Sequence, residues 1–207
     1  MARSIQISTM QELADWLDSL GYFSVDYDST NSTIELRDGD SNVIATLEPY
    51  SQDVLVTLYA YGGQSIALPS YKFPTYIGVT CSGGAVLHFE VNGDMPGRRG
   101  CLVIAKNQNN KVVFAYHQTD IGDFPYYYDV NYRSVSWDDS SLAAYKTDMR
   151  IMNQTILVPI CSRPQLGQTS YCETAFLMYS AQSNAVGQFI LNGSLYYSTG
   201  WFAIKDD

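Results

Sequence analysis

The residues that could do chemistry are concentrated in one acidic and aromatic stretch, residues 117–139. Asp138 and Asp139 are adjacent, and Asp120, Asp123 and Asp129 precede them. Glycoside hydrolysis needs two carboxylates placed across a sugar, and this stretch could supply them. Residue types alone do not position catalytic groups, so a glycan hydrolase is only the second alternative among the functions considered below.

The same stretch holds a group of aromatic residues that could bind a protein or a glycan. They are Tyr126, Tyr127, Tyr128, Tyr132 and Trp137. Aromatic faces with polar rims suit sugars, and aromatics are also enriched where proteins meet. Residues 117–150 lack a clean period, and loops of this length are usually functional. We predict that this segment contacts a neighbouring protein, with a carbohydrate- or host-surface-binding module as the alternative.

Motifs for nucleophilic catalysis and for metals are missing. The sequence has no G-x-S-x-G, H-E-x-x-H, P-loop or G-x-G-x-x-G. The four cysteines are Cys81, Cys101, Cys161 and Cys172. They contain no C-x-x-C pair, and His88 and His117 do not complete a zinc set. Cys81 and Cys101 lie in apolar runs, which predicts buried thiols. We expect no enzyme activity, no catalytic residue, no cofactor and no metal.

Residues 38–42, Asp-Gly-Asp-Ser-Asn, match the start of a calcium-binding loop. An EF-hand loop needs Gly at its sixth position and Glu at its twelfth, where this chain has Val43 and Pro49. Asp, Gly and Asn also supply the geometry of tight turns. The segment is therefore predicted to be the loop of a β-hairpin.

Composition and charge limit the class of partner. The net charge of −9 and the lack of a basic cluster beyond Arg98-Arg99 argue against nucleic-acid binding. Charged residues are only 16% of the chain, which is typical of proteins that cover much of their surface with partners. No apolar run is long enough to span a membrane, and no signal-peptide core is present at the N-terminus. We expect synthesis in the cytoplasm.

The N-terminal residues 1–65 are predicted to form a small α+β domain. Apolar residues at helical spacing mark a helix over 8–21, with Thr9 and Glu12 as a capping box. Four strands with alternating apolar residues follow and form a meander. Two Gly and two Pro in the following segment predict a linker over 66–75.

Residues 76–207 are predicted to form a β-sandwich or barrel-like domain, so that the whole chain is mainly β. Short strands recur between turns rich in Gly and Asn, which is typical of such folds. Asn192-Gly193 is the strongest hairpin signal, because both residues tolerate the positive φ of a type I′ turn. A last strand begins at Trp201 and ends at Ile204, where the charged residues Lys205, Asp206 and Asp207 follow, and we expect it to be paired into the sheet.

The closing segment Phe189–Asp207 resembles the C-terminal end of structural proteins of tailed-bacteriophage particles. In these proteins a "hydrophobic–Asn/Asp-Gly–x–x–Tyr" hairpin leads into an "aromatic–x–Ile–Lys/Arg–Asp" strand. Residues 155–180 are also similar to such β-rich virion proteins. The resemblance implies a non-enzymatic virion component, in the head decoration, head–tail joint, tail or baseplate. Its partners would be copies of itself and other virion proteins.

Overall fold

The chain folds into antiparallel sheets. The computed structural model describes residues 1–51, 53–59, 65–68, 71–91, 99–118, 126–129, 135–136, 155–162, 170–180 and 186–207. Within these ranges the helix is α1 (Met10–Ser19). The strands are β1 (Arg3–Ile7), β2 (Ser24–Asp28), β3 (Thr33–Arg37), β4 (Val43–Tyr50), β5 (Asp53–Tyr59), β6 (Ser65–Ala67), β7 (Tyr71–Cys81), β8 (Gly84–Val91), β9 (Arg99–Lys106), β10 (Val112–Gln118), β11 (Tyr126–Asp129), β12 (Val135–Ser136), β13 (Thr155–Ser162), β14 (Ser170–Ser180), β15 (Val186–Leu191), β16 (Ser194–Thr199) and β17 (Phe202–Lys205). The predicted mainly β fold, with an N-terminal helix and a strand meander, is confirmed.

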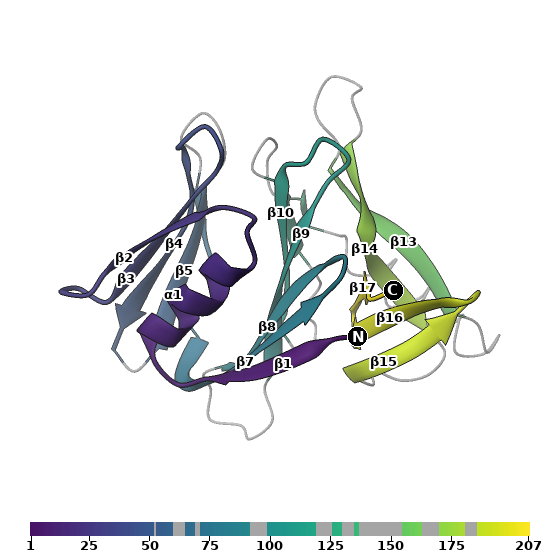
Figure 1. Cartoon of the computed structure of the whole chain (residues 1–207), viewed down its shortest axis with the longest axis horizontal. Helices are drawn as coiled ribbons and strands as arrows, with labels where there is room; N and C mark the ends of the chain where they lie inside the picture. Colours follow the sequence, from purple (N-terminus) through teal and green to yellow (C-terminus); the bar gives the residue numbers. More distant parts are fainter. Residues whose placement is uncertain are drawn as a thin grey trace.

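The strands form three antiparallel groups, shown in Figure 1. The first is the meander β2 to β5, and the second runs from β7 to β12 in sequence order. These two groups join where β5 pairs with β7 over two residue pairs, at Tyr71 and Lys72. Strand β1 pairs with a later part of β7, from Tyr76 to Thr80. The third group has the order β13-β14-β17-β16-β15. A β-sandwich and a barrel are the two architectures that the sequence predicts for residues 76–207. The described strands form open sheets and do not close a barrel.

Strands β8, β9 and β10 are buried on both faces because their side chains alternate between two cores. Leu87, Ile104 and Phe114 belong to a core shared with α1 and the meander. Val86 and Val103 belong to a second core shared with the five-stranded sheet. Figure 1 shows β7 to β10 between the meander on the left and β13 to β17 on the right. These central strands therefore hold the two outer parts together.

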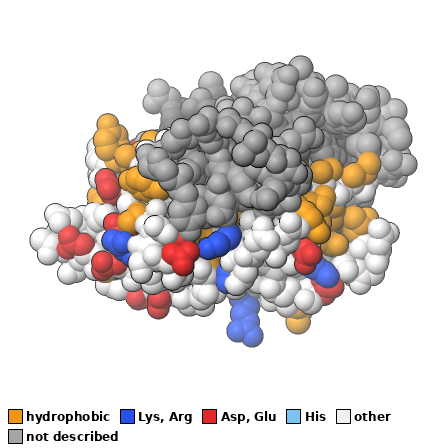
Figure 2. Space-filling view, turned by 90° about the horizontal axis from the view of Figure 1, so that it is seen from above, with side chains coloured by type: hydrophobic (Ala, Val, Ile, Leu, Met, Phe, Trp, Pro, Cys, Tyr) orange, Lys and Arg blue, Asp and Glu red, His pale blue; other side chains and the backbone are white. Residues whose placement is uncertain are grey.

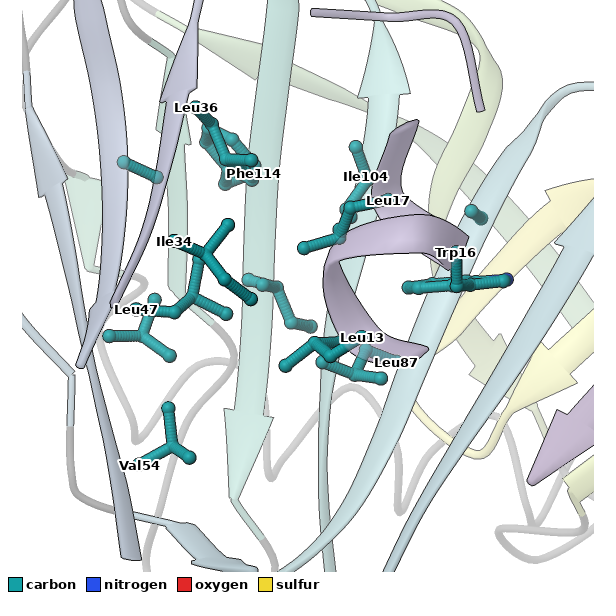
Figure 3. Packing of buried hydrophobic residues seen from close by; sticks show 14 of the residues in the cluster. Leu13, Trp16, Leu17, Ile34, Leu36, Leu47, Val54, Leu87, Ile104 and Phe114 are labelled. Carbon is teal, nitrogen blue, oxygen red and sulfur yellow. The ribbon is translucent and has the colours of Figure 1, made fainter. Parts of the chain in front are cut away.

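The helix begins and packs as the sequence predicts. The Thr9 side chain accepts a hydrogen bond from the Glu12 N–H at 3.1 Å, and the Glu12 carboxylate accepts from the Thr9 N–H at 3.1 Å. This capping box satisfies amides that would otherwise have no partner. In Figure 3, Leu13 and Leu17 point from α1 into the cluster of strand residues. Trp16 is 6% exposed and is a core residue.

Gly78 of β7 lies directly against the Trp16 side chain of the helix. A Cβ added at Gly78 would lie 2.5 Å from Cε2 of the Trp16 indole. The absence of a side chain therefore lets the indole lie directly on the backbone of β7. Trp16 Nε1 is buried and has no hydrogen-bond partner among the described residues.

The division into two domains stays a prediction. The range 66–75, predicted as a linker, contains the end of β6 and the start of β7. The first core includes residues on both sides of this range, from Ile7 of β1 to Tyr116 of β10. The N-terminal helix and meander therefore share one core with the central strands.

The C-terminal hairpin also forms as predicted. Asn192 and Gly193 have φ values of 50° and 85°, and they connect β15 to β16 in an uninterrupted register. The last strand, β17, pairs with β14 on one side and β16 on the other. The end of the chain is thus paired into the sheet, and the Asp206 side chain that follows is buried.

Candidate functional site

Part of the predicted aromatic contact segment lies on a described strand. Tyr126, Tyr127 and Tyr128 are in β11, where their backbones pair with β10 between Phe114 and Tyr116. Tyr132 and Trp137 lie outside the described residues. Of the acidic residues, Asp129 ends β11, and the others lie outside the described residues: Asp120, Asp123, Asp138 and Asp139. The contact and glycan-binding roles of this segment therefore stay predictions.

The three described cysteines are buried core residues. Cys81, Cys101 and Cys172 are buried in the core between the central strands and the five-stranded sheet. Burial, with a smaller effect from Asp206, raises the pKa of Cys81 to about 12. The thiolate is the nucleophilic form, so Cys81 is protonated and inert at neutral pH. The prediction of buried thiols at Cys81 and Cys101 is confirmed.

His88 connects the two sheets that pack across this core. Its Nε2 lies 2.9 Å from the Tyr197 hydroxyl, and the two rings meet edge to face at 5.8 Å. Burial raises the pKa of Tyr197 to about 12, so its hydroxyl is protonated at neutral pH. The contact between the neutral Tyr197 hydroxyl and the His88 ring connects β8 to β16, and a neutral hydroxyl is a poor nucleophile.

The calcium-like segment is a hairpin loop. Asp38 Oδ1 accepts the backbone N–H groups of Asp40 and Asn42, both at 2.9 Å. The carboxylate therefore shapes the turn between β3 and β4, as the residue types predict. No group of three His, Cys, Asp or Glu side chains among the described residues could hold a metal ion.

A small hollow of about 250 Å³ lies beside the turn between β7 and β8. Its lining is Tyr22, Ser82, Gly83, Lys106, Asn107, Glu173 and Thr174. The Lys106 ammonium lies 4.9 Å from the centre of the Tyr22 ring, and burial raises the pKa of Tyr22. The hollow is smaller than the roughly 300–1,000 Å³ of typical ligand sites. Its amine, carboxylate and hydroxyl groups could bind water or a small polar molecule.

The surface that best fits a contact role is the free edge of β15. Among the described strands, β15 pairs only with β16, and it ends the five-stranded sheet. Ile190 is 73% exposed and Val186 is 54% exposed, which places them among the most exposed large apolar side chains of the described residues. The segment Val186–Ile204 contains no Asp, Glu, Lys or Arg. Natural edge strands are commonly protected by charge, proline or bulges, and β15 has none of these.

The hairpin geometry determines which backbone groups of β15 face outward. In a two-residue turn the flanking residues, here Leu191 and Ser194, form a hydrogen-bonded pair. Hydrogen-bonded and non-bonded pairs alternate along an antiparallel ladder. The residues whose N–H and C=O groups point to the free edge are therefore Val186, Gln188 and Ile190. The outward backbone groups and the two exposed apolar side chains thus belong to the same residues.

The sequence predicts this hairpin, but it does not predict that the free edge of β15 is a candidate contact site. The available signal was the run of 19 residues without charge in a chain of net charge −9. On the described part of the face in Figure 2, acidic and basic side chains are mixed, and hydrophobic side chains gather at both ends. The charged surface thus shows no basic patch there that would suit nucleic acid.

No helix among the described residues has the length and apolar character to cross a membrane. Comparisons of the chain with protein-family models, with curated proteins and with solved structures find no match.

Proposed function

We propose that this protein is a non-enzymatic structural component of a phage particle that assembles through symmetric protein–protein contacts. The observation that carries the proposal is the free edge of β15, with Val186 and Ile190 exposed and no charge from 186 to 204. An apolar and unprotected edge strand is best explained by a partner that covers it.

Three further observations support this function. The closing segment Phe189–Asp207 resembles virion structural proteins, and it contains the second half of β15 together with the turn and β16. The described thiols and the His88–Tyr197 pair serve packing, which fits a structural role better than a catalytic one. The low fraction of charged residues, 16%, also suits a protein that is surrounded by copies of itself.

The proposal is tested on particles and on the purified protein. The chain should be found by mass spectrometry in purified particles of the phage that encodes it, at a fixed copy number relative to the major capsid protein. In isolation it should form a defined oligomer by light scattering. A strictly monomeric protein that is absent from particles would rule out this function.

A further inference from the structure

We infer that β15 pairs antiparallel with β15 of a second copy of this chain, joining two five-stranded sheets across a twofold axis. The inference rests on the proposed function, because it names the partner and the surface of one of the symmetric contacts. Four features of β15 carry it: the direction of its backbone groups, its self-complementary register, its lack of charge and its exposed side chains.

The outward backbone groups of β15 can form hydrogen bonds with another strand. The outward N–H and C=O groups belong to alternate residues along the strand, as an antiparallel ladder requires. The pairing of β15 with β16 runs without a register shift, so the free edge has no bulge that would turn it away. A second antiparallel strand can therefore continue the ladder.

One register pairs every outward residue with an outward residue of the second copy. It is centred on Gln188, so that Val186 lies opposite Ile190 of the other copy. Each such pair exchanges two backbone hydrogen bonds and brings two β-branched side chains together. The twofold axis makes the contact isologous, since the same residues are supplied by both copies.

The remaining side chains of the strand fit this register. Gly187 lies opposite Phe189 of the second copy, so the ring meets a residue without a side chain. Phe189 is already oriented by stacking on Tyr196, at 5.5 Å between ring centres. The Gln188 side chain donates to Asp206 Oδ2 at 2.6 Å within its own chain, which fixes it beside the axis.

Charge favours a second copy as the partner. Two chains of net charge −9 repel each other over most of their surfaces. The segment from 186 to 204 is a long region where two copies can approach without bringing like charges together. An apolar, neutral and self-complementary edge thus fits an identical edge better than a charged partner.

The register gives a charge-pairing experiment on the full chain. In Val186→Lys with Ile190→Lys, lysines face each other at both symmetric positions, so association should weaken by roughly 100-fold. In Val186→Lys with Ile190→Glu, each lysine faces a glutamate, so association should return to within about tenfold of the unsubstituted chain. Ile156→Lys, on the other edge strand β13 where Ile156 is 40% exposed, is the matched control.

Molar mass is measured by light scattering over a concentration series, with circular dichroism to verify folding. Because Val186 and Ile190 are largely exposed, both double variants should keep the native spectrum and melting temperature. The inference is supported by loss with two lysines, recovery with lysine and glutamate, and no effect of Ile156→Lys. It is overturned by an unsubstituted chain that stays monomeric, by loss without recovery, or by loss only with Ile156→Lys.

The failure of this inference and of the proposed function can be distinguished. A chain that is present in particles but associates without β15 would overturn the inference and leave the function standing. A chain that pairs through β15 but is absent from every particle would overturn the function and leave the inference standing.

Discussion

The contact between Gly78 and Trp16 gives a sharp test of how the helix is docked. We predict that Gly78→Ala destabilises the protein, because the new Cβ would lie 2.5 Å from Cε2 and 2.8 Å from Nε1 of the indole. Ordinary van der Waals contact begins near 3.4 Å, so the indole must move by almost an ångström. Trp16 is buried between α1 and the central sheet and has little room to do so.

The size of the effect follows from two opposing terms. Overpacking a closely packed core costs typically 1–3 kcal/mol. Replacing glycine by alanine inside a regular strand returns roughly 0.5–1 kcal/mol through the reduced entropy of the unfolded chain. We therefore expect a net loss of about 1–2 kcal/mol in the free energy of unfolding.

The assay is urea denaturation followed by fluorescence and circular dichroism. Gly39→Ala is the matched control, because a Cβ at Gly39 meets nothing within 4 Å and should leave stability unchanged or slightly higher. In a Trp16→Leu background, which removes the indole, Gly78→Ala should be neutral or stabilising. Equal effects of Gly78→Ala in both backgrounds would refute the proposed contact.

Three further predictions concern the helix cap, the end of the chain and pH. Thr9→Ala removes the capping hydrogen bond and should cost about 1 kcal/mol in urea denaturation, and no change would contradict the cap. Asp206→Ala removes the acceptor of the Ala2 N–H at 2.5 Å and of the Gln188 amide at 2.6 Å. It should lower the free energy of unfolding by about 2 kcal/mol, whereas an unchanged melting temperature would contradict this role. Burial raises the pKa values of Cys81 and Tyr197 from 9.0 and 10.0 to about 12 each. Stability from groups with raised pKa values is fully present below the unfolded values and is lost as pH rises through the folded ones. The free energy of unfolding should therefore fall between about pH 9 and pH 12, and a level profile in urea titrations would contradict the burial of these groups.

The elements that were predictable from sequence are those determined by local patterns. The helix follows from the Thr9–Glu12 cap and its apolar face, and the closing hairpin follows from Asn192-Gly193. Each signal lies within a few residues, because caps and tight turns satisfy their hydrogen bonds locally.

The arrangement of these elements depends on contacts between distant residues. The pairing of β1 with β7 joins Ile7 to Tyr76, and β17 enters the sheet between β14 and β16. The short apolar runs of β8 to β10 predict strands, but both faces of these strands carry apolar residues, so the pattern does not show which core each face joins.

The candidate contact surface shows the same limit. The sequence of β15 predicts a strand, but its position at the edge is a property of the strand order. Exposure of Ile190 therefore could not be derived from the alternation of the hairpin alone. The sequence directed attention to the aromatic residues 126–137, because composition reports residue type and not the surface that a fold leaves open.

The most direct test of assembly through β15 is amide hydrogen exchange resolved by residue in the unsubstituted chain over a dilution series. We predict that the outward amides of Gln188 and Ile190 exchange fast in dilute monomer and become protected as the chains associate. The inward amides of Phe189 and Leu191 pair with β16 and should be protected in both states. Exchange at Gln188 and Ile190 that stays fast in the assembled protein would contradict the account.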